Sequence, residues 1–327
     1  MPTLITGAGL VGTMAAARLL ADRLDHPVLY DLVFLPDRLK NWLNLEKVTL
    51  VTGDVTDVAA LMKTIRDYKV DRVIHTAARH TSEVREKPFE GARVNLMGTL
   101  AVFEAARLTG IKRVVFCSSS TLTLGLRHDC PGATLPEDFS LSVVSESPPS
   151  TYASLKLAAE WVGHRYRIEH ALDFVAIRLA GVFGPWAGTL SSPNKLLATV
   201  IESAWYGRPC PMATEDMMNR GSDYVYAHDA GQAAVKAAFA NRPETRVYNI
   251  AMGRLYRLQE IIEIVEAVTG RRVDVTVTEG RPLSGYQNNP APLDISHAIS
   301  ELGYEVTFPM EKAITDYVEK LSGGLLR

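Results

Sequence analysis

Short apolar runs alternate with longer, amphipathic stretches over the first third of the chain. The short runs predict strands, and the longer stretches have the period of helices. Strands are expected at Thr3–Thr6, Pro27–Asp31, Lys47–Thr52, Asp71–Thr76 and Lys112–Cys117, and helices at Thr13–Leu20, Val58–Lys69 and from about Arg85 to Thr109. This alternation is typical of a parallel sheet covered by helices on both faces.

Several of these strands end in small or polar residues. Right-handed crossover connections bring the carboxyl ends of parallel strands to one edge of the sheet, where ligands bind. The residues expected at this edge are Gly7–Gly12, Asp31, Asp54, Ala77 and Ser119. They lie far apart in the sequence, so their shared position at strand ends is the main evidence for a ligand site.

The first strand runs directly into a glycine-rich turn, Gly7-Ala8-Gly9-Leu10-Val11-Gly12, and a helix pattern follows. A strand, a glycine turn and a helix allow backbone N–H groups and the helix amino terminus to approach a pyrophosphate. Glycine turns alone are common. Here the flanking strand and helix are both present, which favours a dinucleotide site.

Asp31 ends the second predicted strand and is followed by Leu32 rather than by an arginine. A carboxylate at this point accepts hydrogen bonds from a ribose diol and repels a 2′-phosphate, so it favours NAD over NADP. The alternative is that Asp31 is an ordinary turn residue at the end of a strand.

Tyr152 and Lys156 are four residues apart, so they lie on one face of a helix. Lowering the pKa of a tyrosine by about three units requires about 4 kcal/mol. An ammonium group about 4 Å away, at an effective dielectric constant of about 20, supplies that much. The pair therefore predicts an acid–base tyrosine, although the same spacing also occurs in amphipathic helices with an exposed lysine.

These residues resemble the extended short-chain dehydrogenase/reductase superfamily, in its NAD-dependent epimerase/dehydratase branch. The resemblance covers nearly the whole chain, with a glycine motif one residue shorter than is usual. It implies a Rossmann-type doubly wound α/β fold with a smaller carboxyl-terminal substrate-binding lobe, NAD as cofactor, and a catalytic set of Ser119, Tyr152 and Lys156, with Ser120 as the competing register. The implied cofactor-binding residues are Gly7, Gly9, Leu10, Val11, Gly12, Asp31, Asp54, Val55, Ala77, Ala78, Asn95, Tyr152, Lys156 and Leu179.

The later chain has further segments similar to the family, namely Phe174–Pro185, Ser222–Asp229, Tyr248–Ala251 and Glu301–Tyr304. It also departs from the sugar-nucleotide members. Gly181 and Ser222 stand where those members usually have an asparagine and an arginine, Arg281 lacks its usual acidic neighbour, and Leu124 replaces an aromatic residue. Ser119-Ser120-Thr121 replaces the T-D-E turn of the 4,6-dehydratases, which argues against dehydration. These departures favour a smaller substrate without a nucleotide, and Arg79 and His80 are the candidate residues to reach it.

Composition limits the remaining possibilities. The net charge is −2, with 35 basic and 37 acidic side chains, so there is no electrostatic footprint for nucleic acid. The apolar runs are too short for a membrane span, and neither the three cysteines nor the eight histidines have metal-ligand spacing. Met1-Pro2 leads straight into the first strand, so we expect no signal peptide and a cytoplasmic protein.

We expect two lobes, residues 1–175 binding NAD and residues 176–327 binding substrate, with a loop from Leu126 to Pro136 over the site. The resemblance implies a homodimer formed through the helices Arg85–Thr109 and Thr151–His170. Three functions remain open. The first choice is an NAD-dependent dehydrogenase acting on a secondary hydroxyl of a small sugar, sugar acid or hydroxy compound. The alternatives are a sugar-nucleotide epimerase with tightly bound NAD and a non-catalytic NAD(H)-sensing protein.

Overall fold

The computed structural model describes residues 2–123, 134–138, 150–185, 195–214, 218, 221–241, 243–278 and 291–324. Leu124 and Arg281 lie outside these residues, as does most of the expected loop from Leu126 to Pro136. Within the described segments, no helix combines the length and the apolar character that crossing a membrane requires.

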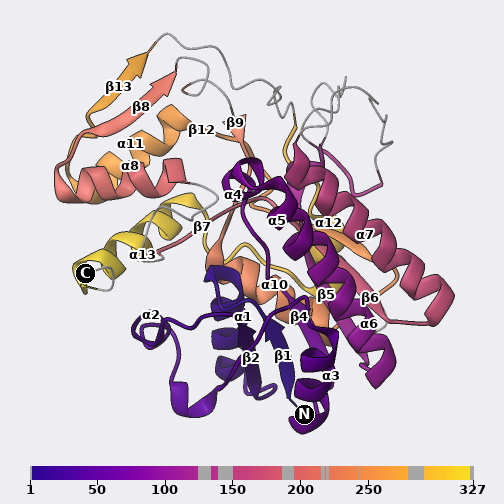
Figure 1. Cartoon of the computed structure of the whole chain (residues 1–327). Coiled ribbons are helices and arrows are strands. Elements are labelled where there is room, and N and C mark those ends of the chain that lie inside the picture. The colour runs from indigo at the N-terminus through magenta and orange to yellow at the C-terminus, as the bar shows by residue number, and fades with distance from the viewer. Residues whose placement is uncertain are drawn as a thin grey trace.

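A seven-stranded parallel sheet forms the centre of the molecule (Figure 1). Its strands lie in the order β11-β6-β5-β4-β1-β2-β3, and six of them follow the strand order of a doubly wound Rossmann sheet. The strands are β1 Thr3–Thr6, β2 Pro27–Asp31, β3 Thr49–Thr52, β4 Arg72–His75, β5 Arg113–Ser119, β6 Phe174–Leu179 and β11 Val247–Ile250. The predicted fold class is therefore confirmed.

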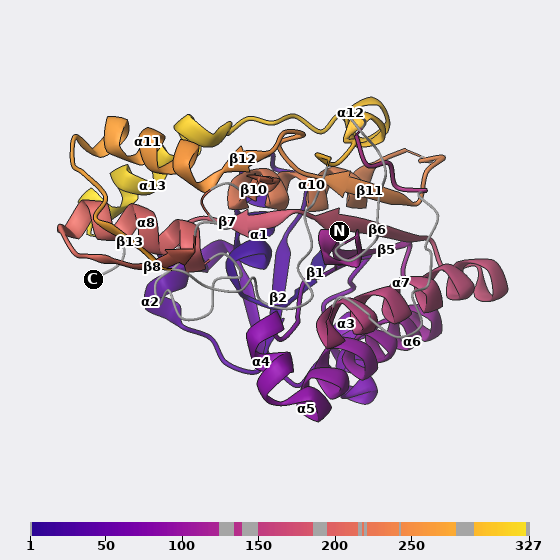
Figure 2. The same ribbon diagram turned by 90° about the horizontal axis from the view of Figure 1, so that it is seen from above.

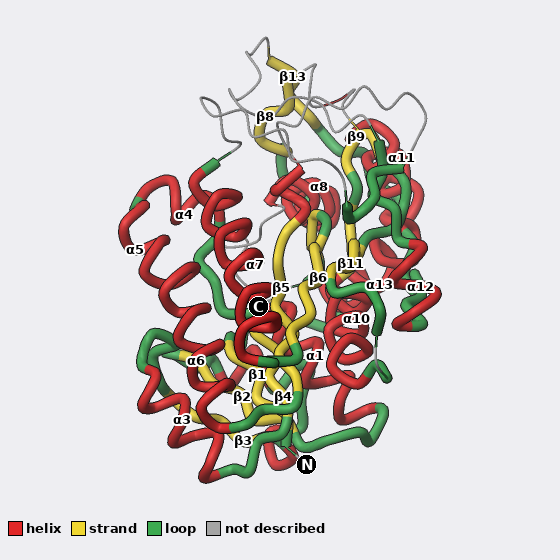
Figure 3. The backbone as a smooth tube through the Cα atoms, turned by 90° about the vertical axis from the view of Figure 1, so that its right-hand side faces the viewer, coloured by secondary structure: helices red, strands yellow, loops and turns green. Residues whose placement is uncertain are grey.

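Helices cover both faces of this sheet (Figures 2 and 3). One face packs on α3 Val58–Asp67, α6 Thr99–Thr109 and α7 Thr151–His170, and the other on α1 Leu10–Ala21, α10 Ala227–Phe239 and α12 Ser296–Leu302. Side chains alternate between the faces along each strand. In β5, for example, Val115 and Cys117 belong to the core beneath α1 and α10, whereas Val114 and Phe116 face α6 and α7.

The helix expected from about Arg85 to Thr109 is not one regular helix. The chain forms α4 Thr81–Glu86, α5 Pro88–Ala92, a π-helical turn Arg93–Gly98 and then α6. Pro88 begins α5, and because proline lacks an N–H it cannot continue the hydrogen bonds of α4. The π-helical turn follows α5 directly and places Arg93 and Asn95 toward the loops that end β3 and β4.

Many elements of the second half of the chain pack around a separate apolar core. Its elements are β7 Gly181–Phe183, α8 Lys195–Tyr206, β8 Cys210–Thr214, β9 Gly221–Ser222, β10 Tyr224–Tyr226, β12 Tyr256–Arg257, α11 Leu258–Thr269, β13 Val275–Thr278 and α13 Met310–Ser322. In Figure 1, α8, α11, β8 and β13 lie together on one side of the main sheet. The expected boundary after residue 175 falls inside β6, and β11 returns to the main sheet, so the division into two lobes stays a prediction.

Short elements complete the amino-terminal half: α2 Pro36–Leu39 and the 3-10 turns η1 Leu45–Lys47 and η3 Ser120–Thr123. Helix η1 ends at Lys47, the residue that was expected to begin the third strand, and Asn44 caps it by accepting a hydrogen bond from the N–H of Glu46. Strand β5 runs two residues farther than expected and pairs Ser119 with Leu179 of β6. The serine cluster therefore begins within the sheet itself.

Candidate active site

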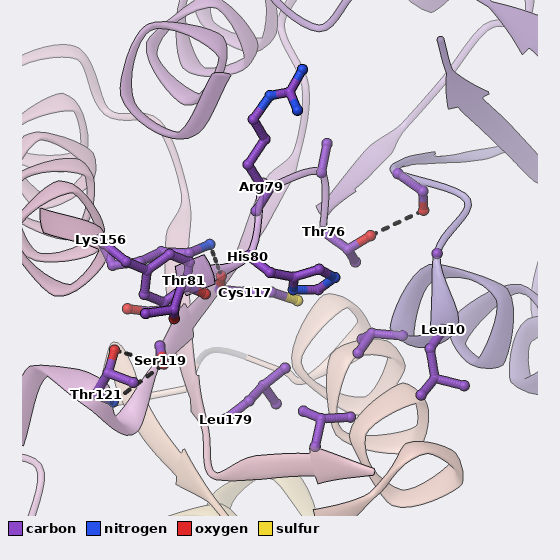
Figure 4. Close-up of a pocket in the computed structure, with 18 of the residues that line it drawn as sticks. Leu10, Thr76, Arg79, His80, Thr81, Cys117, Ser119, Thr121, Lys156 and Leu179 are labelled. Atoms are coloured by element: carbon purple, nitrogen blue, oxygen red, sulfur yellow. Dashed lines mark hydrogen bonds between the residues drawn. The ribbon is translucent and has the colours of Figure 1, made fainter. Parts of the chain in front are cut away.

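A cavity of about 630 Å³ lies at the carboxyl ends of the main-sheet strands (Figure 4). It extends from the serine cluster after β5, past the ends of β4 and β1, to the ends of β2 and β3. The predicted site residues that line it are Gly7, Gly9, Leu10, Val11, Asp31, Asp54, Val55, Ala77, Ala78, Arg79, His80, Ser119, Ser120, Tyr152, Lys156 and Leu179. Gly12 and Asn95 are not among the lining residues.

The glycine turn approaches the end of β4 so closely that side chains are excluded. Gly7 has a φ of +93°, and a Cβ atom there would lie 2.7 Å from the backbone nitrogen of Ala77. A Cβ on Gly12 would lie 1.9 Å from the carbonyl oxygen of Gly7. Gly12 therefore permits the packing of α1 against the turn. Around Gly9, by contrast, a Cβ would meet no atom within 4 Å, so this glycine faces open space.

The amino terminus of α1 is free of side-chain caps. Gly9 is the capping residue, and the first turn of the helix contains no acidic residue. The first N–H groups of a helix have no partner inside the helix, and together with the helix dipole they bind anions. The helix terminus has no side-chain cap, and glycines at positions 7 and 9 leave the turn open. Together with the long cavity, these features fit a dinucleotide with its pyrophosphate at Gly9–Val11.

Asp31 contributes to the same turn in a way that sequence spacing did not reveal. Its Oδ2 atom accepts a hydrogen bond of 2.6 Å from the backbone N–H of Ala8. The carboxylate therefore connects the end of β2 to the glycine turn after β1 while also lining the cavity. Its assignment to a ribose diol stays a prediction.

Lys156 is almost completely buried at the end of the cavity that holds the serine cluster, with 3% of its surface exposed. Its Nζ atom donates a hydrogen bond of 2.7 Å to the carbonyl oxygen of Cys117 and lies 4.7 Å from the centre of the Phe116 ring. Burial lowers the pKa of Lys156 from its ordinary value of 10.5 to about 8, although the nearby Glu160 carboxylate favours the charged form. The ammonium form therefore still predominates at neutral pH.

Tyr152 does not have the low pKa that the sequence spacing predicted. Burial raises its pKa to about 12, and a hydrogen bond with Ser119 is the contribution that lowers it. The Nζ atom of Lys156 is 5.8 Å from the centre of the Tyr152 ring and is bound to the Cys117 carbonyl. In this geometry the penalty for burying a phenolate exceeds its stabilisation by Ser119, so that expectation was wrong.

The Ser119 hydroxyl is held by Thr121, a residue that the sequence did not single out. The Oγ atom of Ser119 accepts hydrogen bonds from both the backbone N–H of Thr121, at 3.2 Å, and its hydroxyl, at 3.0 Å. These two donors occupy both lone pairs of the serine oxygen. The Ser119 hydrogen is therefore left to be donated elsewhere, and Ser119 favours the phenolate form of Tyr152, which lowers the pKa of that tyrosine.

Asn95 does not line the cavity but holds the backbone of Arg79, which does. It is buried, and its side chain both accepts a 2.7 Å hydrogen bond from the N–H of Arg79 and donates a 2.9 Å bond to the Arg79 carbonyl.

Figure 4 shows the ring of His80 between Thr76 and Cys117, whereas the side chain of Arg79 extends away from them. Burial lowers the pKa of His80, so its imidazole is neutral at neutral pH.

A buried ion pair behind Lys156 was also missed. Glu160 and Arg178 are 2.5 Å apart, and both side chains are almost fully buried. Glu160 also accepts a 2.8 Å hydrogen bond from the hydroxyl of Ser118, which turns away from Ser119 toward α7. The only sequence signal for this pair was the position of Glu160 four residues after Lys156, on the same helix face.

Two of the departures from the family pattern, Gly181 and Ser222, lie on the cavity wall. They line it together with Asp223 and Tyr224. The Asp223 carboxylate accepts hydrogen bonds from the backbone N–H groups of Tyr224, at 2.8 Å, and Leu293, at 3.1 Å, while burial raises its pKa to about 7.

Within the described parts of the chain, no group of three metal-ligating side chains occurs.

The buried charge of Lys156 predicts a pH-dependent stability. Between about pH 8 and 10.5 the folded chain has released the Lys156 proton while the unfolded chain retains it, so the free energy of unfolding rises with pH. The Lys156→Met variant buries no charge, so its free energy of unfolding should exceed that of the wild type at about pH 7. This difference should shrink by about 2 kcal/mol by about pH 9.5, because only the wild type gains stability from Lys156 over this range.

Urea denaturation of both proteins at the two pH values measures this difference. Cys117 is present in both, so the titration of its thiol cancels in the comparison. A difference that does not change with pH would contradict a lysine pKa lowered by burial.

Comparison with known proteins shows the family of this chain and supports its fold. Residues 3–251 match the NAD dependent epimerase/dehydratase family. The chain is 32% identical to the UDP-glucose 4-epimerase of Mycolicibacterium smegmatis over 241 residues, which cover 72% of this chain and 73% of that protein. It is 25% identical over 325 residues to the dTDP-D-glucose 4,6-dehydratase of Mus musculus, covering 96% of this chain and 86% of that protein.

A solved structure also resembles the whole chain. The Thermus thermophilus UDP-glucose 4-epimerase, in complex with NAD, superposes with a TM-score of 0.82 at 24% identity and covers 99% of both chains. At this level of identity the superposition supports the fold. The match over residues 3–251 shows the family, and so this chain is an NAD-dependent enzyme of the NAD dependent epimerase/dehydratase family, within the extended short-chain dehydrogenase/reductases.

Proposed function

We propose that this enzyme is a sugar-nucleotide epimerase that inverts a carbon of a UDP-sugar and keeps its NAD bound throughout the reaction. The single observation that carries the proposal is the 32% identity to a UDP-glucose 4-epimerase over nearly three quarters of the chain. This reverses the preference drawn from Gly181 and Ser222, which had favoured a dehydrogenase acting on a small free sugar or hydroxy compound.

The side chains at the catalytic end of the cavity support acid–base chemistry on a hydroxyl group. Bound NAD supplies the group that takes up and returns a hydride. Tyr152 exchanges a proton with the substrate hydroxyl, and Ser119, whose lone pairs are occupied by Thr121, donates its hydrogen to the same oxygen. Lys156 adds positive charge to a site in which burial opposes the Tyr152 phenolate.

Two rival activities use the same cavity. A 4,6-dehydratase needs an additional acid–base pair to expel water, and Ser120-Thr121 offers hydroxyl groups rather than carboxylates where such a pair is expected. A non-catalytic NAD(H) sensor requires no acid–base residues, whereas Tyr152 and Ser119 line the cavity together with the buried Lys156. Both observations favour the epimerase.

The purified protein should carry NAD and convert UDP-glucose, or another UDP-sugar of a panel, into its epimer without accumulating NADH. Tyr152→Phe should lower turnover by at least about 100-fold, because positioned acid–base groups contribute about 10² to 10⁴. Bound NAD should be retained. Tyr68→Phe is the control, because Tyr68 lies at the end of α3 with 39% of its surface exposed.

Mass spectrometry of the products separates the alternatives. Release of one NADH per substrate would identify a dehydrogenase, and loss of one water from the sugar nucleotide would identify a dehydratase. Turnover that survives in Tyr152→Phe would remove Tyr152 from its proposed role.

The two serines on the cavity wall allow a matched test of the hydroxyl that assists Tyr152. Ser119→Ala should lower turnover by about 100-fold, the cost of losing one aligned donor in other enzymes. It should also move the acidic limb of the pH–rate profile to higher pH, because Tyr152 must be unprotonated to take up the hydroxyl proton and Ser119 lowers its pKa. Ser120→Ala should retain most of the activity, and the opposite ranking would transfer the role to Ser120.

We also propose that two copies of the chain pair through α6 and α7. These helices lie side by side at the outside of the molecule (Figure 1). Trp161 and Ile168, two turns apart on α7, are 51% and 61% exposed, and Leu108 on α6 is 47% exposed. Large apolar side chains gathered on one face favour a protein partner, and family resemblance favours a second copy.

Trp161→Glu should convert the dimer to a monomer in sedimentation or light-scattering measurements, because it places a charge in the centre of the proposed contact. Leu24→Glu is the matched control, since Leu24 is an exposed apolar residue in the turn after α1. A wild-type monomer, or a Trp161→Glu dimer as stable as the wild type, would contradict the proposed contact.

A further inference from the structure

The cavity has a reactive end and a remote end, and the strand order separates them. Tyr152, Lys156 and Ser119 lie by β5, the glycine turn follows β1, and Asp31 and Asp54 follow β2 and β3. A dinucleotide with its reactive ring at β5 and its pyrophosphate at α1 therefore extends its second nucleoside toward β2 and β3. Asp54 is at the far end of that path.

The Asp54 carboxylate is held in one orientation by three hydrogen bonds, one of which is also an ion pair. Its Oδ1 atom accepts the backbone N–H of Thr56 at 2.9 Å and the Thr56 hydroxyl at 2.8 Å. Its Oδ2 atom is 3.1 Å from the Nη1 atom of Arg93. The Asp54 carbonyl accepts a 3.1 Å hydrogen bond from the Tyr30 hydroxyl, which fixes the backbone as well. One oxygen is thus saturated, while Oδ2 can accept another donor.

Arg93 reaches Asp54 because of the π-helical turn. Its guanidinium also contacts the Thr56 hydroxyl at 3.1 Å and the Glu90 carboxylate at 3.1 Å. Gly98, at the other end of the turn, lets it approach the loop after β3, since a Cβ there would lie 2.7 Å from a methyl group of Val55. π-Helical turns occur frequently at functional sites. This one connects α5 and α6 to the remote end of the cavity.

Charge gives Arg93 a second effect at this end. Asp31 and Asp54 both line the cavity, so two carboxylates lie near the negatively charged phosphates of a bound dinucleotide. Arg93 compensates one of these carboxylates. The Arg93 and Asp54 side chains are 38% and 31% exposed, so the pair is worth little to folding, and its removal should leave the protein stable.

The family resemblance implies that Asp54 binds the cofactor. We propose that Arg93 is a positioning residue, which aligns the Asp54 carboxylate to accept a hydrogen bond from the exocyclic amine of the cofactor's adenine. The amine of adenine is a hydrogen-bond donor, which matches the free position on Oδ2. The inference rests on NAD as the cofactor and does not depend on which sugar the enzyme converts.

The probe is nicotinamide hypoxanthine dinucleotide, in which a carbonyl oxygen replaces the adenine amine. The full chain is equilibrated with an equimolar mixture of this analogue and NAD, and the bound nucleotides are quantified by mass spectrometry. The wild type should bind NAD in preference by about tenfold or more, because hydrogen bonds to charged groups are among the stronger ones. Arg93→Gln should reduce the preference to about threefold or less, and Arg93→Lys should be intermediate.

Arg18→Gln is the matched control. Arg18 and Asp22 form an ion pair on α1 whose side chains are likewise 38% and 31% exposed, and neither residue lines the cavity. This variant should keep the wild-type preference. Asp54→Asn provides a second test, because its amide NH₂ can donate to the hypoxanthine oxygen and should shift binding toward the analogue.

The binding ratio requires no turnover, so it is independent of the proposed epimerase activity. A wild type without a preference for NAD over the analogue would overturn the assignment to the adenine amine. A preference that survives in Arg93→Gln would overturn the role of Arg93. An equal loss in Arg18→Gln would attribute the effect to charge in general and would also overturn it.

Discussion

The cofactor cavity depends on the close approach of the glycine turn to the end of β4. The Thr76 hydroxyl donates hydrogen bonds to the carbonyl oxygens of Thr6 and Gly7, at 2.9 and 3.0 Å, and so ties β4 to the turn after β1. There is no space for a side chain at Gly7 or Gly12. This contact sets the position of α1, and therefore directs its uncapped amino terminus into the cavity.

A second constraint supports the first from the opposite side of α1. Gly231 of α10 packs so closely on α1 that a Cβ atom would lie 2.6 Å from the backbone of Met14. The helix is thereby held between α10 and the sheet, with little freedom to move its terminus away from the cavity. Preorganised N–H groups bind an anion at a smaller entropic cost than groups that must first be ordered.

At the reactive end, burial and hydrogen bonding act in opposite directions. Burial disfavours both the Tyr152 phenolate and the Lys156 ammonium, whereas Ser119 favours the phenolate and Glu160 favours the ammonium. The balance leaves a protonated tyrosine beside a lysine that is charged at neutral pH and loses its proton above about pH 8. Acid–base groups perform best when their pKa values lie near the working pH, so the surrounding contacts are as important as the two residues themselves.

The order of strands and helices, the glycine turn and the Tyr152–Lys156 pair were readable from the sequence, because local periodicity and spacing encode them. The expected helix from about Arg85 to Thr109 ran through Pro88, although the missing N–H of this proline could have indicated a break there. The π-helical turn after it had no such signal, because it depends on packing against the loops that end β3 and β4. The pKa of Tyr152 was misjudged for a similar reason. Spacing places a cation nearby, whereas only the folded structure decides how deeply the phenol is buried and where the ammonium group is bound.

Asp31, Thr121 and Arg93 show the same division. The sequence by itself determined that Asp31 ends a strand and that Thr121 follows the serines, because these are facts of order along the chain. The tertiary structure decided that Asp31 accepts the N–H of Ala8, that Thr121 orients Ser119, and that Arg93 holds Asp54 across 39 positions of the chain. Hydrogen bonds have a reach of about 3 Å and a preferred direction, so they are set by how elements pack and not by the spacing of residues in a sequence.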